Sequence, residues 1–277
     1  MDYIDLHTHT TASDGTFTPT NLIAYAKEKG LKAVAVTDHD TLDGLKEAVK
    51  AGKDYGITVI PGIEISAEYR GADLHVLGLN VDYEQPDFVS EINRCHSLRE
   101  ERNVKMIARL NEKGFDISSD DMVRQFGEAT FTRAHYAQMM IDKGYVKDKN
   151  EAFSKYLNPG MPLYIPREKV TPEQAIHIIK LGHGKPVLAH PLLYHLTDEE
   201  IDELVGNLVK EGLVGMEAIY VLNKGDDTER MTAIAQKHGL FITGGSDFHG
   251  TIKPDIDLGV GKGNLKVPAW LLENIID

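Results

Sequence analysis

Residues 4–15 read IDLHTHTTASDG and place two histidines, His7 and His9, directly behind an apolar start. A run of alternating residues is typical of a β-strand, in which successive side chains point to opposite faces. His7 and His9 would therefore share one face of a strand. An isolated H-x-H pair fits a core histidine beside a surface histidine as well as it fits two ligands of one site. The rest of the chain has to decide between these interpretations.

Short β-rich runs alternate with helical runs in both halves of the chain. The expected strands are residues 4–8, 32–38, 58–66, 73–80, 185–191, 215–220 and 240–247. Thr18, Pro19 and Gly30 mark the start and the end of a first helix, and further helices are expected at about 41–55, 197–211 and 227–238. Parallel strands with crossover helices form either an open doubly wound sheet or a closed barrel. The sequence has neither G-x-G-x-x-G after the first strand nor a P-loop, which disfavours nucleotide-binding folds.

The middle of the chain has a different character. Residues 86–168 contain no convincing strand, and helices are expected at 88–113, 119–127, 132–143 and 150–157. We interpret 86–168 as a helical insertion that caps a barrel domain made of residues 1–85 and 169–277. The alternative is a set of ordinary core-packing helices in one continuous domain.

Composition narrows the class of protein. The net charge of -13 argues against broad adhesion to nucleic acid or to an anionic membrane. A single cysteine, Cys95, excludes an internal disulfide framework and a thiolate-rich zinc site. No apolar run approaches the roughly 18 residues of a spanning helix, and no signal segment precedes the first strand. We therefore expect a cytoplasmic protein that does not engage the membrane.

Histidines and carboxylates recur where the expected strands end. They are His7, His9 and Asp14, then Asp38 and His39 in TDHD, Glu64 in PGIEIS, His75 in LHVLG, His190 in AHP, and Asp247 and His249 in GSDFHG. In a parallel barrel these strand ends meet at one face. Burying so many imidazoles and carboxylates without a cation costs several kcal/mol, which bound divalent metals remove. Nitrogen and oxygen ligands without sulfur suit zinc, manganese or iron, and the number of ligands suits two to three ions.

The motifs DLHTHTTASDG, TDHDTLDG, PGIEIS, LHVLG, AHP and GSDFHG, in this order, resemble the polymerase and histidinol phosphatase (PHP) family of metal-dependent phosphoesterases. The resemblance implies an α/β fold, a distorted (β/α)7 barrel of the PHP type with a trinuclear metal centre. By this resemblance the metal ligands would be His7, His9, Asp14, His39, Glu64, His75, His190, Asp247 and His249. Glu64 would bridge two metals, and His190 or His249 would pass a proton to the leaving group. Asp38 is expected to orient a ligand histidine from outside the metal centre.

The insertion is expected to select the substrate. Arg133 and His135, in FTRAHYA at 131–137, could clamp a second phosphate, because a guanidinium offers a planar fork of donors. Arg99 and Arg102 lie three residues apart on one expected helix and could share a face. The run from 131 to the AHP strand resembles the TrpH and YciV type subgroup. That resemblance implies a metal-activated hydroxide acting on 3′,5′-bisphosphonucleotides, AMP or short 5′-phosphorylated RNA, and no obligate protein partner is expected.

Several other functions stay open at this point. Histidinol-phosphate phosphatase is a sibling activity, and the subgroup-like insertion disfavours it. A non-catalytic PHP protein that only binds metal would need a lost ligand, and the motifs show none. An amidohydrolase would usually carry a carboxylated lysine or a different ligand order, and a polymerase-associated PHP module belongs to a far longer chain.

Overall fold

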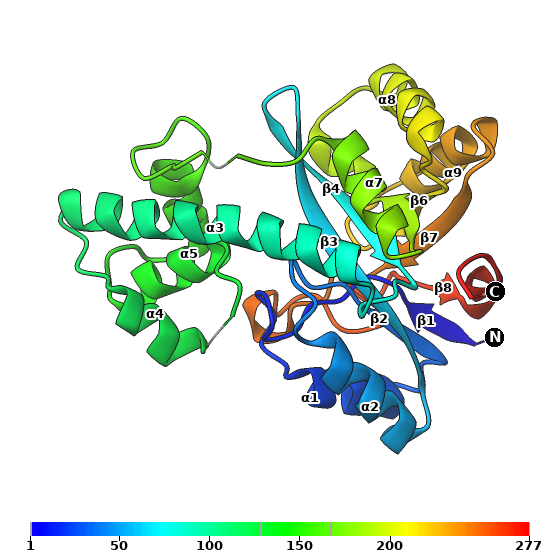
Figure 1. Cartoon of the computed structure of the whole chain (residues 1–277), viewed down its shortest axis with the longest axis horizontal. Coiled ribbons are helices and arrows are strands. Elements are labelled where there is room, and N and C mark those ends of the chain that lie inside the picture. Colours follow the sequence, from blue (N-terminus) through cyan, green and yellow to red (C-terminus); the bar gives the residue numbers. More distant parts are fainter. Residues whose placement is uncertain (1, 128, 167, 277) are drawn as a thin grey trace.

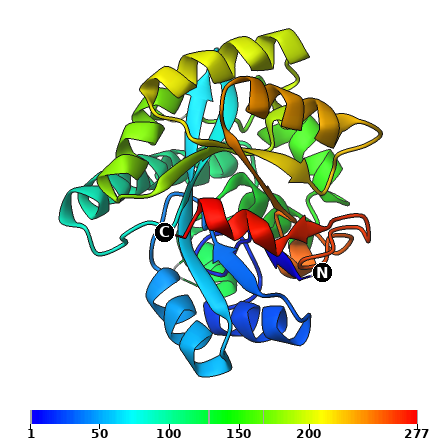
Figure 2. The same ribbon diagram turned by 90° about the vertical axis from the view of Figure 1, so that its right-hand side faces the viewer.

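One sheet organises the chain in the computed structural model, which describes residues 2–127, 129–166 and 168–276. Its strand order is β7-β6-β5-β4-β3-β2-β1-β8. The strands are β1 (Tyr3–Asp5), β2 (Ala33–Val36), β3 (Thr58–Tyr69), β4 (Ala72–Leu79), β5 (Lys185–Leu188), β6 (Gly215–Tyr220), β7 (Phe241–Gly245) and β8 (Val267–Pro268). Leu6 donates its N–H to the carbonyl of Gly244, so β1 also lies beside β7 and the sheet nearly closes. The expected (β/α) barrel is confirmed (Figure 2).

One strand runs against the direction that the sequence suggested. β4 pairs antiparallel with both β3 and β5, and β8 pairs antiparallel with β1, whereas the other pairs are parallel. The expectation of parallel strands throughout was wrong here, because only Arg70 and Gly71 separate β3 from β4. Their φ angles of 51° and 80° are those of a tight hairpin turn, and a parallel partner needs a crossover of a dozen or more residues.

Helices cover the outside of the barrel. They are α1 (Pro19–Glu28), α2 (Leu45–Tyr55), α7 (Pro172–Leu181), α8 (Asp198–Glu211) and α9 (Asp227–Lys237). Thr18 caps α1 by accepting the N–H of Asn21, and Pro19 occupies the first turn, as the sequence predicts. Helix α7 was not among the expected elements. Its signal was nevertheless present, because Thr171 and Gln174 form a capping box.

The insertion consists of α3 (Pro86–Glu112), α4 (Ser119–Phe126), α5 (Arg133–Asp142) and α6 (Lys149–Ala152), which continues into a π-helical turn at Phe153–Leu157. Figure 1 shows α3 extending from the barrel into this separate lobe. Phe88 and Ile92, in its first half, belong to the barrel core. Met106 and Leu110, in its second half, belong to the core of the insertion. Helix α3 is therefore shared by both cores, and the division at 86 and 168 stays a prediction.

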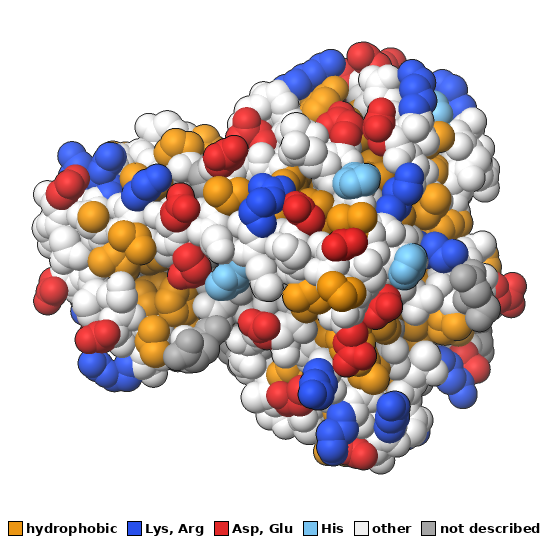
Figure 3. Space-filling view, in the orientation of Figure 1, with side chains coloured by type: hydrophobic (Ala, Val, Ile, Leu, Met, Phe, Trp, Pro, Cys, Tyr) orange, Lys and Arg blue, Asp and Glu red, His pale blue; other side chains and the backbone are white. Residues whose placement is uncertain are grey.

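Surface charge is mixed on the face that Figure 3 shows. Basic and acidic side chains are interspersed there over both lobes. Across the described ranges, no helix combines the length and the apolarity needed to cross a bilayer.

Candidate metal centre

The structure brings together all nine residues that the sequence singled out as ligands. His7, His9 and Asp14 follow β1, His39 follows β2, Glu64 lies in β3, His75 lies in β4, His190 follows β5, and Asp247 and His249 follow β7. Glu64 and His75 do not lie at strand ends. His75 reaches the centre because β4 runs antiparallel, so that the start of this strand lies beside the carboxyl ends of its neighbours.

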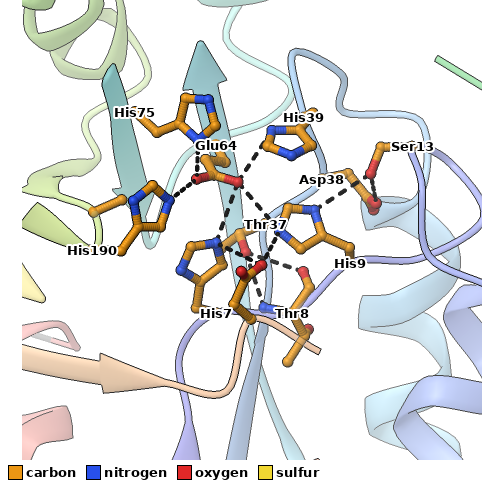
Figure 4. A network of polar contacts seen from close by, with 12 residues as sticks. His7, Thr8, His9, Ser13, Thr37, Asp38, His39, Glu64, His75 and His190 are labelled. Atoms are coloured by element: carbon orange, nitrogen blue, oxygen red, sulfur yellow. Dashed lines mark hydrogen bonds and ion pairs between the residues drawn. The ribbon is translucent and has the colours of Figure 1, made fainter. Parts of the chain in front are cut away.

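Glu64 lies at the middle of the cluster (Figure 4) and is only 1% exposed. Five imidazole nitrogens surround its carboxylate: Nδ1 of His75 at 2.7 Å and Nε2 of His190 at 3.0 Å from Oε1, and Nε2 of His7 at 3.2 Å, Nε2 of His9 at 3.2 Å and Nδ1 of His39 at 3.1 Å from Oε2. Each oxygen therefore faces a different group of histidines. Both oxygens of Glu64 are thus placed to serve as ligand atoms, and Glu64 belongs to two of the residue groups that could hold an ion.

Two further carboxylates extend the cluster. Asp14 Oδ1 lies 3.2 Å from Nε2 of His249, and Asp247 Oδ1 lies 3.3 Å from Nε2 of His9. Four overlapping groups have ligand atoms within 4.8 Å of one another: His9–Asp14–His39–His249, His7–Glu64–His190, His7–His9–Asp247 and His39–Glu64–His75. Because the groups share members, the geometry fits a centre with more than one ion.

The unmatched polar atoms of this cluster call for a cation. Within the described ranges, His7 Nε2, His9 Nε2, Asp14 Oδ1 and His39 Nδ1 are buried without a well-oriented hydrogen bond. A buried polar atom left in this state costs about 1–3 kcal/mol. A divalent ion that prefers nitrogen and oxygen ligands would engage all four atoms. The residues present therefore fit the expected metals.

Electrostatics leads to the same conclusion. Burial works to raise the pKa of Glu64, but the surrounding histidines outweigh it and hold that pKa well below its usual range. Burial works to lower the pKa of His9, yet hydrogen bonds to Asp247 and Glu64 raise it to about 9. The carboxylates thus favour positive charge on their neighbours, and a metal ion supplies that charge without a proton.

Glu217, in β6, orients the centre from outside and was missed by the sequence analysis. Its fully buried carboxylate accepts Nδ1–H of His7 at 3.0 Å and the backbone N–H of His190 at 2.9 Å. Binding Nδ1 leaves Nε2 of His7 free to face the cluster, which is the usual role of a carboxylate beside a metal-binding histidine. The acidic residue in the otherwise apolar run GMEAIY was its signal in the sequence.

Asp38 has a less direct place than expected. Its carboxylate accepts the N–H of Thr10 at 2.7 Å and the hydroxyl of Ser13 at 2.6 Å. The Ser13 hydroxyl lies 3.5 Å from Nδ1 of His9, so Asp38 reaches a histidine only through Ser13. Its main effect is to fix the loop that carries Asp14.

Three of the four expected substrate-binding residues line one cavity beside the metal centre. Arg99, Arg102 and Arg133 face this cavity together with Asp14, His39, Ser66, Asp73, His75 and Lys169. We call this cavity the arginine pocket. Lys169 and Ser66 were missed, because nothing in their local sequence distinguishes them from ordinary surface or strand residues.

His135 lies elsewhere, which corrects the expectation that it clamps a phosphate beside Arg133. It does not line the arginine pocket but closes the capping box of α5, where its Nδ1 accepts the N–H of Thr132 at 3.0 Å. The hydroxyl of Thr132 in turn donates to Asp14 Oδ2 at 2.9 Å. This cap therefore fastens the insertion to the loop of a candidate ligand.

His135 should make the stability of the protein depend on pH. Burial lowers its pKa to about 4, so an unfolded chain with an ordinary histidine binds the proton more tightly between pH 6.5 and 4. The free energy of unfolding should fall by about 3 kcal/mol across this window as pH decreases, and be fully retained above it. Denaturant unfolding of the wild type and of His135→Gln at pH 7 and pH 4 measures the difference, since glutamine keeps the cap but does not titrate. An equal loss in both proteins would contradict the assignment.

A barrel that gathers histidines and carboxylates around Glu64 at one end of its sheet defines a metal-dependent hydrolase of the barrel class. The PHP domain family matches residues 5–157 of the chain. A 5′-3′ exoribonuclease of Haemophilus influenzae is 34% identical over 245 residues, 88% of this chain and 89% of that protein. A 3′,5′-nucleoside bisphosphate phosphatase of Chromobacterium violaceum is 33% identical over 260 residues, 94% and 91% of the two chains. The chain belongs to the PHP domain family.

Two solved structures share this fold, although their descriptions differ in the class of enzyme. A Bifidobacterium adolescentis protein assigned to the metal-dependent phosphoesterases aligns with a TM-score of 0.87 and 31% identity, over 99% of this chain and 96% of that one. A Chromobacterium violaceum protein described as an amidohydrolase with bound sulfate and no metal aligns with a TM-score of 0.84 and 33% identity, over 93% and 90%. The family membership expected from the motifs is confirmed.

Proposed function

We propose that this chain is a metal-dependent phosphoesterase that removes the 3′-phosphate of a 3′,5′-bisphosphonucleotide or cleaves the equivalent bond at the 5′ end of a short RNA. The names of its relatives support a substrate of this kind. Within this proposal the centre holds two or three divalent ions, manganese, zinc or iron. A cytoplasmic location stays a prediction.

One observation carries the choice of substrate: a cationic pocket opens directly beside the candidate metal centre. His39 and His75, the two candidate ligands that are only partly buried, line the same cavity as Arg99, Arg102, Arg133 and Lys169. Asp73 bonds both Arg133 and Lys169, and Asp40 bonds Arg99. Asp14 also lines the pocket, so four cations stand against three carboxylates and leave an excess of one positive charge. Such a pocket suits a second phosphate on a substrate whose first phosphate lies at the metals.

Two guanidinium groups of the arginine pocket are held by neighbouring side chains. Arg99 is held by Asp40 and by the hydroxyl of Ser66 at 3.1 Å. The Arg133 guanidinium lies 5.8 Å from the ring centre of Tyr164. Held guanidinium groups lose little freedom when they bind a phosphate, so the distance between the two phosphates of the substrate becomes a criterion for binding.

The residues of the centre divide the chemical work. When bound, the metals polarise the phosphoryl oxygens and activate water for attack on phosphorus. Glu64 and the histidines around it fix the positions of the ions. Nδ1 of His249 lies 2.8 Å from the carbonyl of Asp247, which leaves Nε2 as a ligand atom. Nε2 of His190 also faces the cluster, 3.0 Å from Oε1 of Glu64, so we assign both histidines to binding, and a proton transfer from either of them to the leaving oxygen stays a prediction.

Histidinol phosphate fits this pocket poorly. It has one phosphate and an ammonium group, and the ammonium would meet the arginines. A protein that only binds metal would show no turnover at all. Both alternatives therefore differ from the proposal in a single assay.

The decisive experiment measures phosphate release from 3′-phosphoadenosine 5′-phosphate by the manganese-loaded protein. AMP, histidinol phosphate and a short 5′-phosphorylated RNA are assayed beside it. Preference for the bisphosphonucleotide or the RNA supports the proposal. Turnover of histidinol phosphate alone would overturn the role of the arginine pocket while leaving the metal centre intact.

Removal of the Arg133 guanidinium should weaken binding of the 5′-phosphate. For Arg133→Met we expect KM for 3′-phosphoadenosine 5′-phosphate to rise by about tenfold or more, since a charge-assisted hydrogen bond contributes about 1.5–3 kcal/mol. Adenosine 3′-phosphate, which lacks the 5′-phosphate, should be turned over equally by both proteins. Arg124→Met, an exposed arginine of α4, is the matched control. Equal effects on both substrates would show that Arg133 does not read the 5′-phosphate.

A further inference from the structure

The loop at 11–16 separates two cavities. Asp14 lines the arginine pocket, whereas Ser13 and Gly15 line a second cavity of about 490 Å³. Thr251, two residues after His249, lies on the same wall. The second cavity therefore borders the residues that flank two candidate ligands.

The insertion contributes several lining residues of this cavity, among them His135 with a ring N–H donor. His135 is 2% exposed, and its Nδ1 accepts the N–H of Thr132, so the ring proton lies on Nε2. No described residue accepts a hydrogen bond from this Nε2, and His135 lines the cavity. Because burial lowers its pKa to about 4, the ring is a neutral donor at pH 7.

The remaining lining groups from the insertion are acceptors and an aromatic ring. Gln125 and Gln138 both donate an amide N–H to Asp142. Their amide oxygens are therefore the atoms that can accept a hydrogen bond from a ligand. The ring of Phe126 lies with its centre 4.6 Å from that of His135.

The chemistry of the second cavity differs from that of the arginine pocket. Among its described lining residues there is no lysine or arginine, so a phosphate has no counter-charge there. The lining also includes the carboxylate of Asp142, which accepts the amide N–H groups of Gln125 and Gln138. The neutral donor, amide oxygens, hydroxyls and aromatic face that remain match an uncharged heteroaromatic ring with a sugar attached. The volume also lies in the range of small-molecule sites.

We propose that the second cavity holds the nucleoside that follows the scissile phosphate in a 5′-phosphorylated RNA chain. This inference rests on the proposed function. The 5′-phosphate of the first nucleotide would occupy the arginine pocket, and the next phosphate would lie at the metal centre beside Asp14. The following nucleoside would then lie on the other side of the 11–16 loop.

The same bond breaks in both proposed substrates. Water adds to phosphorus, the bond from phosphorus to the 3′-oxygen of the first nucleotide breaks, and this oxygen takes up a proton. A bisphosphonucleotide yields a nucleoside 5′-monophosphate and inorganic phosphate. An RNA chain yields the same monophosphate and a shorter chain with a new 5′-phosphate. Of the two substrates, only the RNA chain has a further nucleoside that can occupy the second cavity.

The test fills the cavity and compares the two substrates. Gln138→Trp, on the half-buried face of α5, should lower kcat/KM for a 5′-phosphorylated dinucleotide by at least about tenfold relative to kcat/KM for 3′-phosphoadenosine 5′-phosphate, since stacking contributes this much per base. Gln236→Trp, exposed on α9, is the matched control and should leave the ratio within about twofold of the wild type. Phe126→Ala is a second variant, and thermal unfolding checks that each protein is folded.

Each outcome decides a different point. A change of the ratio in Gln138→Trp and Phe126→Ala, but not in the control, supports the second cavity as a nucleoside site. An unchanged ratio in both folded variants overturns this inference alone, because the wild type still acts on both substrates. Failure of the wild type to act on either substrate overturns the proposed function and this inference with it.

Discussion

Alanine at His9 should abolish turnover and empty the metal centre at the same time. Nε2 of His9 lies 3.2 Å from Glu64 and 3.3 Å from Asp247, so it stands between two of the three central carboxylates. A metal that polarises a phosphoryl oxygen contributes several kcal/mol, and each 1.36 kcal/mol corresponds to tenfold in rate. We therefore expect kcat/KM to fall by about 10³-fold or more, together with the metal content of the purified protein.

The control and the contrary result are both simple to measure. His177→Ala replaces an exposed histidine of α7 and should change neither quantity. Metal bound only to the folded state stabilises it by mass action, so a chelator should lower the thermal midpoint of the wild type but not that of His9→Ala. Full activity in a variant that has lost its metal would contradict the assignment of the site.

Glutamine at Glu217 should weaken the centre without removing a ligand. Oε1 of the carboxylate accepts from His7 Nδ1 and Oε2 accepts the backbone N–H of His190, and in glutamine one of these two oxygens is replaced by an NH2 group that cannot accept. Partners of this kind contribute about 10–100-fold in metal affinity or activity, and Glu217 holds residues that follow two different strands. We therefore expect a loss of about 100-fold in metal affinity, measured by competition with a chelator.

Turnover of Glu217→Gln at saturating metal shows whether the substitution weakens only metal binding or also the reaction of the metal-loaded protein. If Glu217 acts through the position of His7, excess manganese should restore much of the activity of Glu217→Gln. Glu229→Gln, exposed on α9, is the matched control. Wild-type metal affinity in Glu217→Gln would show that the His7 ring is held in place without this carboxylate.

Local sequence signals predicted most of the elements and the nine candidate ligands, but not Glu217. Thr18 and Pro19 start α1 at the expected place, and the motifs around Glu64 and His249 carry the resemblance to the family to which the chain belongs. Such signals are short-range, because a cap, a turn or a motif involves residues that are close in the chain. These signals can be recognised in the sequence without knowledge of the fold.

Contacts between distant segments could not be predicted from local sequence signals. His7 and Glu217 are 210 residues apart, and the sequence around either residue does not indicate that the two are in contact. The same holds for Lys169, which meets Asp73 at the arginine pocket across 96 residues. His135 was misplaced because a histidine three residues after Thr132 can cap its own helix as well as face a substrate. Only packing chooses between these roles.

By itself the sequence determined the family, the barrel class and the set of candidate ligands, since each depends on residue types at fixed spacings. Tertiary structure decided how these residues are used. The reversal of β4 brings His75 to the centre, and Glu217 orients His7. The docking of the insertion through Thr132 creates a cavity on each side of Asp14. The physical reason is that strand direction and long-range contacts follow from the burial of a whole sheet, to which each local segment contributes only a part.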